Sequence, residues 1–381
     1  MRLRAAATIV ALILALTACA GSSTKGSAAG AGSGGGASFA SATSAADGGG
    51  MDALVAAAKK EGTLNVIALP RDWTNYGELL DGFAAKYGLK INNANPNGSS
   101  ADELTAITSL KGQSRAPDVV DVGQSFALSG AKDGLYAPYQ VATWKDIPET
   151  LKEASGMWTN DYGGYISIGC DTTKVKTCPT SMAALNDPAY KGKVALNGDP
   201  TKANAAFSAV WAAALAKGGS LDDIKPGIAL FKDLKKGGIY VPVQATAATI
   251  QSGETPIVLN WDYLNASQAD AMKAKGGNFS VAVPSDAKFA AYYAQAISKY
   301  APHPAAARLW EEYLYSVEGQ NGWLKGYGRP VELEAMTTAK TVNASYAAKL
   351  PPVSGTPTFP TGDQVTAAKA IVTQDWANAV K

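Results

Sequence analysis

Ala58-Lys-Lys-Glu-Gly-Thr-Leu-Asn-Val66 joins an alanine-rich segment to a short apolar run. Residues 51–61 are typical of a helix, and Gly62 suits the position after its C-terminus because glycine adopts a left-handed backbone without strain. The apolar run at 64–69 is short and bounded by turn residues, which predicts a buried strand. The folded part of the chain is therefore expected to begin with a helix and a strand.

The same alternation continues toward the C-terminus. Residues 76–87 place their apolar side chains on one helical face, and residues 90–94 predict a second strand. Ser100 is expected to begin the next helix, with Glu103 three residues later completing a capping box. Residues 118–122 predict a third strand. Strands and helices alternating at this spacing predict a parallel, doubly wound α/β sheet.

A second unit follows residues 163–168, which predict a connecting strand. Strands and helices alternate again up to a strand at 279–283, and residues 292–298 predict a strand that returns to the first unit. The expected fold class is α/β, with two doubly wound lobes joined by crossing hinge strands. The predicted parts are 51–165 (lobe 1), 166–284 (lobe 2), 285–328 (return to lobe 1) and 329–381 (a C-terminal segment packing on lobe 2).

Residues 1–18 have the organisation of a signal peptide. Two arginines precede an apolar run at 5–16, which is too short to cross a bilayer because spanning takes about 20 residues. Leu16-Thr-Ala-Cys19 resembles the bacterial lipobox, in which the cysteine is lipidated and becomes the mature N-terminus. The alternative is an ordinary secretory signal with a chance cysteine. Lipidation at Cys19 predicts an extracytoplasmic protein on the outer face of the cytoplasmic membrane, anchored only by lipid.

Residues 19–50 consist almost entirely of Gly, Ser, Ala and Thr. Such a segment has little apolar surface to bury, so it predicts a flexible tether between the lipid and the folded body.

Composition restricts the class of partner. The chain has 381 residues, of which 46% are hydrophobic and 17% charged, as in globular proteins. Removal of Arg2 and Arg4 with the signal peptide leaves equal numbers of basic and acidic residues. Binding to nucleic acid needs a basic surplus on one face, so no nucleic-acid partner is expected.

Cys170 and Cys178 remain once Cys19 is assigned to the lipobox. An even pair of cysteines in an oxidising compartment predicts a disulfide, which would close the short loop 171–177. The alternative is two separate free thiols.

Several stretches, in this order and spacing, resemble the solute-binding lipoproteins of ABC importers, which have the type II periplasmic-binding fold. The resemblance covers Cys19 and residues 51–328, and it extends to the subgroup that binds polyamines, iron or phosphonates. It implies a monomer that closes by a hinge motion on a small-molecule ligand between its lobes, with ABC permease and ATPase subunits as partners. The stretches are Ala58-Lys-Lys-Glu-Gly-Thr-Leu-Asn-Val66, Ala116-Pro-Asp-Val-Val-Asp-Val122, Leu185-Asn-Asp-Pro-Ala-Tyr-Lys-Gly-Lys-Val194, Ala301-Pro-His-Pro-Ala-Ala-Ala-Arg-Leu-Trp310 and Ser316-Val-Glu-Gly-Gln320.

Candidate ligand-binding residues follow the predicted strands. In open α/β sheets a ligand sits beyond the carboxyl ends of the strands, near helix N-termini. The loops after three strands of lobe 1 and two strands of lobe 2 meet this condition. Their candidate residues are Arg71, Asp72, Trp73, Asn75, Tyr76, Ser99, Ser100, Gln124, Ser125, Thr201, Asn260, Trp261, Asp262 and Tyr263.

Each of these residues also has a structural interpretation. Helix capping explains Ser100 and Thr201 as well as ligand contact does. Core packing is the alternative for Trp73 and Trp261, although both stand next to Asp in expected loops.

The residues needed for several kinds of catalysis are scarce. A Ser-His-Asp or Cys-His group needs a histidine, and the single one, His303, stands between two prolines. Zinc sites need more His and Cys than the chain has. No catalytic residue, metal or cofactor is therefore expected. A hydrolase that works with two carboxylates, or an adhesin lipoprotein, is the alternative of another class.

Two loops favour an amine as the ligand. Residues 73–76 and 261–263 are similar to the aromatic loops of polyamine-binding members of the family. Asp72 and Asp262 would hold the amine ends, and the aromatic faces would cover the stem.

An oxyanion such as a phosphonate is the competing interpretation. It would bind at the helix N-termini that carry Ser99, Ser100 and Thr201, with Arg71 as a clamp. Neutral polar solutes are a third possibility. Tyr292-Tyr293 resembles the tyrosine pair of ferric-ion binders, but neighbouring side chains on a strand point to opposite faces, so iron is not favoured.

Overall fold

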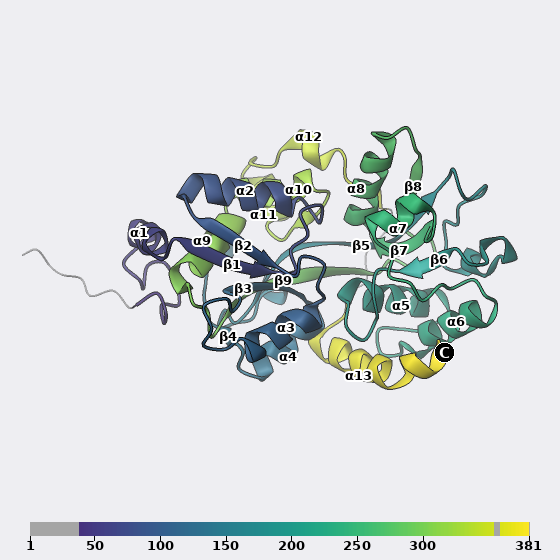
Figure 1. Ribbon diagram of the computed structural model, residues 1–381, viewed down its shortest axis with the longest axis horizontal. Helices are drawn as coiled ribbons and strands as arrows, with labels where there is room; N and C mark the ends of the chain where they lie inside the picture. Colours follow the sequence, from purple (N-terminus) through teal and green to yellow (C-terminus); the bar gives the residue numbers. More distant parts are fainter. Residues whose placement is uncertain (1–37, 354–358, 381) are drawn as a thin grey trace, which may run out of the picture. The chain divides into compact units, whose positions relative to one another are not determined.

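The computed structural model describes residues 38–353 and 359–380 (Figure 1). The predicted signal peptide, Cys19 and the first part of the predicted tether lie outside these ranges. Within them, no helix combines the length and the apolar character that crossing a membrane requires.

Lobe 1 is built on three strands whose carboxyl ends face the same way. β1 (Thr63–Ile67) pairs in parallel with β2 (Lys90–Ala94). β3 (Val119–Gly123) follows Asp118, whose N–H donates to the Asn65 carbonyl of β1. Alternate side chains of β3 enter different cores: Val119 belongs to the larger one, whereas Val120 and Val122 pack with helices α3 and α4. The helices of this lobe are α1 (Met51–Glu61), α2 (Tyr76–Tyr87), α3 (Ser100–Ser109), α4 (Gln124–Lys132) and α9 (Pro304–Leu314).

Helix α3 begins at Ser100, as expected, but its capping box lies one residue earlier than expected. Its N-cap is Ser99, which forms a capping box with Asp102, instead of Ser100 with Glu103. Ser100 therefore lies in the first turn, where its Oγ accepts a hydrogen bond from the Gly123 N–H at 3.1 Å. Glu103 is buried and accepts from the Asp121 N–H at 2.9 Å. The sequence offers two adjacent serines and two adjacent acids, and contacts with β3 decide which pair caps the helix.

The two lobes share one long strand. β5 (Thr159–Asp171) pairs with β9 (Ala290–Ser298) over its first half and with β7 (Ile257–Trp261) and β8 (Phe279–Ala282) over its second half. β9 also pairs with β3 of lobe 1. The crossing strands of the expected fold class are therefore present, and the α/β fold class is confirmed (Figure 1).

Lobe 2 repeats the architecture of parallel strands and covering helices. β6 (Val194–Leu196) pairs in parallel with β7. Tyr240 adds only a single parallel bridge, to Val194 of β6. The helices are α5 (Asn204–Ala216), α6 (Lys225–Lys236), α7 (Ala247–Ser252) and α8 (Asp262–Lys273). Short elements fill the connections: β4 (Tyr136–Ala137) and the 3₁₀ turns Trp144–Asp146, Glu149–Leu151, Ala183–Asn186 and Pro188–Tyr190.

The C-terminal segment contacts both lobes, which differs from the expected packing on lobe 2. α10 (Val317–Lys325), in the part expected to return to lobe 1, packs on α2 and α9. Within the C-terminal segment, β10 (Arg329–Pro330) pairs with β5 in its lobe-1 half. After α11 (Leu333–Thr338) and α12 (Ala344–Ala347), helix α13 (Gly362–Ala379) packs against both α4 and α6. Lys369 of α13 lies over Phe126 of lobe 1 and Phe207 of lobe 2.

Residues 38–50, the end of the predicted tether, pack on lobe 1. Ala42 and Ala45 are buried. The Ala42 carbonyl accepts a 2.8 Å bond from buried Arg308, and the Thr43 carbonyl accepts a 2.7 Å bond from the Gln140 N–H. Small side chains and backbone carbonyls hold this segment, so its composition alone does not reveal that it is ordered.

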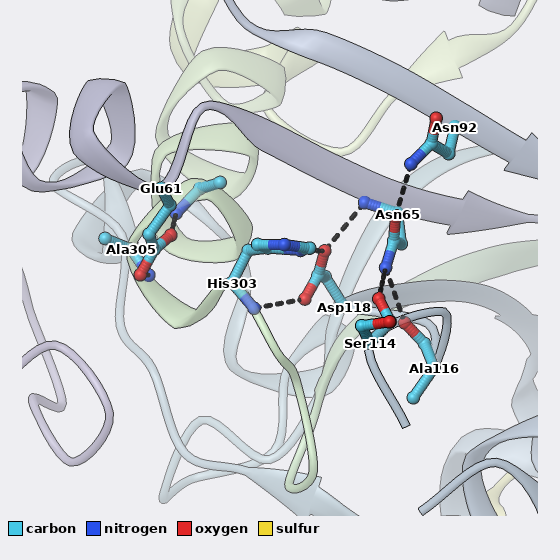
Figure 2. Close-up of polar contacts among 9 residues, drawn as sticks. Glu61, Asn65, Asn92, Ser114, Ala116, Asp118, His303 and Ala305 are labelled. Carbon is cyan, nitrogen blue, oxygen red and sulfur yellow. Dashed lines mark hydrogen bonds and ion pairs between the residues drawn. The ribbon is translucent and has the colours of Figure 1, made fainter. Parts of the chain in front are cut away.

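A polar cluster lies at the amino end of β3, remote from the carboxyl ends of the strands (Figure 2). The backbone N–H of His303 donates to Asp118 Oδ1 at 2.7 Å, and its Nδ1 lies 2.9 Å from Asp118 Oδ2. The Asn65 N–H donates to the same Oδ2 at 2.6 Å. The single histidine therefore joins the start of α9 to β1 and β3.

Candidate ligand-binding site

Two adjoining cavities, of about 210 and 220 Å³, lie between the lobes. Their walls are the loops after β1 and β2 of lobe 1, and the loop after β6 and the N-terminal end of α7 in lobe 2. They therefore occupy the carboxyl ends of the strands, where a ligand is expected. The residues that line both cavities are Pro70, Trp73, Asn97, Gly98, Asn197 and Gln244.

Aromatic side chains form one wall of this cleft. Trp73 donates from Nε1 to the Tyr162 hydroxyl at 2.7 Å, which fixes the plane of its indole ring. The edge contact between Trp73 and Tyr293 has a centroid distance of 5.7 Å. Tyr76 and Tyr293 line the first cavity beside Trp73. The wall therefore offers flat apolar faces whose polar atoms point away into the protein.

Asp121, the middle residue of β3, lies in the wall of the first cavity. The residue is 6% exposed, and Oδ2 accepts hydrogen bonds from the hydroxyls of Tyr76 at 2.7 Å and Tyr162 at 2.9 Å. Oδ1 has no hydrogen-bond partner within the described part of the chain. Burial raises the pKa of Asp121 to about 7, against the opposing effect of the two tyrosines. A buried carboxylate oxygen without a partner is costly unless a ligand supplies a donor.

More acidic groups lie behind Asp121. Gln295 Nε2 donates to the Tyr76 hydroxyl at 2.9 Å and to Asp161 Oδ2 at 3.0 Å. Burial raises the pKa of Asp161 and of Glu103 above the usual carboxyl range, and the charge of Asp121 adds to both shifts. The inner end of the cleft is therefore an environment in which a positive charge is favourable.

Six of the predicted residues line the cleft. Ser99, Ser100 and Tyr76 line the first cavity, Asp72 and Asn260 the second, and Trp73 both. Ser99 is at the same time the cap of α3, so its hydroxyl has a structural role as well.

Arg71 and Asn75 point elsewhere. Arg71 is exposed and forms two hydrogen bonds with Asp81, at 3.1 and 2.5 Å, on the outer surface of α2. Asn75 donates to the Gly322 carbonyl at 3.2 Å and lines a different cavity, between α2 and α10. The expected clamp on an anionic ligand is thus held away from the cleft by an ion pair.

The expected aromatic and acidic site of lobe 2 is internal. Asp262 is buried, with Oδ2 2.6 Å from Arg329 Nη1 and Oδ1 accepting from the N–H groups of Tyr165 and Tyr263. Trp261 and Tyr263 are fully buried and stack on each other at 6.0 Å. This loop therefore packs in the core, and Arg329 supplies the positive charge that pairs with Asp262.

Three further predicted residues line neither cavity as far as the structure describes them. Gln124 Oε1 accepts from Asn160 at 3.2 Å. Ser125 is buried at the start of α4. The N–H and hydroxyl of Thr201 both donate to Asp199 Oδ1 at 2.8 Å, which closes a turn.

Sequence reasoning missed Asp121 and most of the lobe-2 wall. The sequence predicts Asp121 only as part of a strand, yet a lone acid within Val119-Val-Asp-Val is a signal, because burying a charge is costly unless a partner or a ligand compensates for it. The amides and the lysine of lobe 2 stand in ordinary polar loops or at helix ends, and nothing in the sequence distinguishes them. They are Asn197, Lys202, Asn204, Gln244, Asn265 and Gln268.

Tyr292 and Tyr293 lie on opposite sides of β9. Tyr292 stacks on Phe359 at 5.9 Å, whereas Tyr293 contacts Trp73 in the cleft. Adjacent tyrosines in this arrangement cannot bind one metal ion together. Among residues 38–353 and 359–380, no group of three or more His, Cys, Asp or Glu side chains could hold a metal.

A disulfide joins Cys170, at the end of β5, to Cys178. The bond lies in lobe 2, and neither cysteine lines the two cavities.

The fold and the cleft are those of a binding protein with two lobes, and sequence comparison assigns the family. The profile of the family described as bacterial extracellular solute-binding protein matches residues 114–354, more than half of the chain. The chain belongs to this family. No curated protein sequence matches it.

Solved structures of periplasmic binding proteins share the fold. AfuA from Actinobacillus pleuropneumoniae, bound to exogenous fructose-6-phosphate, matches with a TM-score of 0.66 and 18% identity over 84% of this chain and 98% of AfuA. Iron-bound HitA from Pseudomonas aeruginosa matches with a TM-score of 0.59 and 19% identity over 82% and 97%. A putative spermidine/putrescine ABC transporter from Listeria monocytogenes matches with a TM-score of 0.62 and 11% identity over 83% and 99%. At these identities the matches establish the fold and leave the ligand open.

The protein is thus a solute-binding protein of the ABC-transporter type. Membership of an extracellular solute-binding family implies an extracytoplasmic location, a small-molecule ligand and an ABC permease as partner. Proteins of this family bind substrates for transport.

Proposed function

We propose that the protein captures a small, polyamine-like amine in the cleft between its lobes and delivers it to an ABC permease. The ammonium group binds at Asp121, and the aliphatic stem lies along Trp73. In the mature protein, lipid on Cys19 holds the monomeric body at the outer face of the membrane.

The unbonded Oδ1 of Asp121 is the observation that carries this proposal. An ammonium group donates hydrogen bonds, and its positive charge would balance the negative charge of the buried carboxylate. Trp73, Tyr76 and Tyr293 add aromatic faces, and each cation–π contact contributes about 0.5–2 kcal/mol. Asp72 lines the second cavity and offers an acid for a second amine.

Other features of the cleft make an oxyanion the weaker candidate. Arg71 is bonded to Asp81, so it supplies no clamp. The N-terminus of α3 already holds an anion, because the Asp102 carboxylate accepts from the N–H and hydroxyl of Ser99. Acids outnumber bases around the first cavity, where Asp102, Glu103, Asp121 and Asp199 face Lys202.

Calorimetry of the soluble body against putrescine, spermidine and 2-aminoethylphosphonate tests the proposal. Asp121→Asn should weaken amine binding by about 30-fold or more, because losing one partner of a buried charged pair costs roughly 2–5 kcal/mol. Since Asp121 must be ionised to hold an ammonium, amine affinity should also rise from pH 6 to pH 8 in the native protein and not in the variant.

Asp233→Asn is the matched control, since it makes the same change on an exposed acid of α6, outside the cleft. If no amine binds and Arg71→Ala abolishes phosphonate binding, the amine proposal is wrong.

A further inference from the structure

We propose that Tyr327 of lobe 1 and Asp270 of lobe 2 form a latch that holds the cleft closed on its solute. Neither residue lines either of the two cavities, so their role is conformational. The latch acts on closure and does not depend on which solute binds. It therefore goes beyond the proposed function and can be tested separately from the amine.

The two side chains of the latch come from different lobes. Tyr327 lies between α10, which packs on α2 and α9, and β10, which pairs with the lobe-1 half of β5. Asp270 lies on α8, which packs on β7 and β8 of lobe 2. The hydroxyl of Tyr327 donates to Oδ2 of Asp270. This hydrogen bond crosses from one lobe to the other, and its acceptor is charged, which makes it stronger than a neutral one.

The backbone of Tyr327 is strained. Its φ is 66°, a left-handed conformation that a bulky residue rarely adopts. Glycine would fit this position without strain, and both neighbours, Gly326 and Gly328, are glycines. Such strain persists only where the surroundings enforce it, and it is concentrated at functional sites. The side chain of Tyr327 therefore has a role that a glycine could not fill, and its hydrogen bond to lobe 2 is such a role.

The strained segment packs against the loop that carries Trp73. Thr74 and Asn75 also have positive φ values, of 43° and 66°. A Cβ placed on Gly326 would be 2.4 Å from the carbonyl carbon of Thr74, so the two segments touch backbone to backbone. Trp73 lines both cavities. A solute that lies against Trp73 therefore stabilises the loop on which the segment of Tyr327 rests.

The position of Asp270 along α8 makes its contact sensitive to opening. The first residue of this helix, Asp262, binds Arg329 and accepts from the Tyr165 N–H of β5, so this end is tied to the strand that both lobes share. Asp270 lies about 12 Å further along the helix axis, at a rise of 1.5 Å per residue. A hinge motion at β5 displaces it more than it displaces Asp262. We therefore expect opening to break the contact with Tyr327 and to keep the contact between Arg329 and Asp262.

Single-molecule fluorescence energy transfer on the soluble body measures how often the cleft is closed. Cysteines for the dyes replace Thr105 of α3 and Ser252 of α7, which are exposed positions on helices that border the cavities from either lobe. The native pair Cys170 and Cys178 is held in its disulfide and does not react. The ratio of closed to open molecules is measured without a solute and with putrescine.

Tyr327→Phe should lower the ratio of closed to open molecules at least about fivefold, because it removes only the hydroxyl that donates to a charged acceptor. Asp270→Ala should have the same effect, and the double variant should be no worse than either single one. Tyr190→Phe is the matched control. Its hydroxyl donates to the Thr177 carbonyl within lobe 2, so its loss should leave the ratio unchanged.

Stopped-flow measurements with putrescine provide a second readout. The latch forms after the solute has entered, so Tyr327→Phe should raise the dissociation rate by the same factor and leave the association rate unchanged. A variant that is merely misfolded would lose binding sites without changing either rate constant in this way.

An unchanged ratio in Tyr327→Phe, or effects of Tyr327→Phe and Asp270→Ala that add in the double variant, would overturn the latch. A native protein that never reaches the closed distance, with or without putrescine, would overturn it as well. If putrescine does not bind but Tyr327→Phe still lowers the ratio in the protein without solute, the latch stands and the amine is wrong.

Discussion

At the residue scale, some buried acids have a basic side chain as their partner and others do not. Asp262 has Arg329, and Asp118 has His303. Asp121 has two neutral tyrosines on one oxygen and no partner on the other. Two of these three acids are thus structural, and the third faces the cleft.

The His303–Asp118 pair makes stability depend on pH. Its hydrogen bond to Asp118 raises the pKa of His303 above the unfolded value of about 6.5. A raised pKa means that the stabilisation is complete below about pH 6.5 and is lost as pH rises through the folded pKa. Urea unfolding of the native protein and of His303→Gln should therefore show a larger difference in the free energy of unfolding at pH 5.5 than at pH 9. A difference that stays constant across this range would contradict the assignment.

At the scale of elements, one covalent bond and one helix cap hold two parts of the chain: the disulfide holds the loop after β5, and a capping box holds the start of α13. The disulfide follows the last residues of β5, where the chain leaves the sheet and enters the loop before η3 (Ala183–Asn186). Helix α13 starts with a capping box of Thr361 and Gln364 and carries the chain from α4 to α6.

Reduction of the disulfide should lower stability by a moderate amount. The cysteines are separated by 8 positions, and the chain-entropy estimate for so short a loop is about 2–3 kcal/mol. Urea unfolding with and without a thiol reductant measures the difference without removing any side chain. A titration that finds two accessible thiols in the unreduced, unfolded mature protein would show that the bond is absent.

At the scale of the whole molecule, two kinds of connection join the lobes. β5 runs through both, so we expect it to serve as the hinge, while α13 contacts α4 of lobe 1 and α6 of lobe 2. Opening of the cleft must bend β5 and loosen α13 from one of these helices. Trp376 of α13 packs on Phe231 and Tyr240 of lobe 2, so we expect α13 to stay with that lobe.

The mature protein should become more compact when it binds its solute. Small-angle scattering with and without a saturating amine should show a smaller radius of gyration in the bound state, because the ligand contacts both lobes. The Asp121→Asn variant at the same amine concentration is the control and should show no change. Identical profiles for the native protein would exclude hinge closure without excluding binding.

The sequence by itself determined the α/β class and the two lobes. Short apolar strands such as 64–69, alternating with amphipathic helices, allow few other arrangements, because each apolar face has to be covered. The order and spacing of five short stretches also pointed to the family, because together they extend over most of the folded chain.

Only the tertiary structure decided which polar side chains face the cleft. The position of a residue in a loop places its backbone. Contacts with residues that are distant in the sequence decide where its side chain points. Asp81 draws Arg71 outward, and Arg329, 67 positions after Asp262, binds that acid inside the protein. Asp121 became a site residue because Tyr76, Tyr162 and the first turn of α5 meet around it, and none of these contacts is local in the sequence.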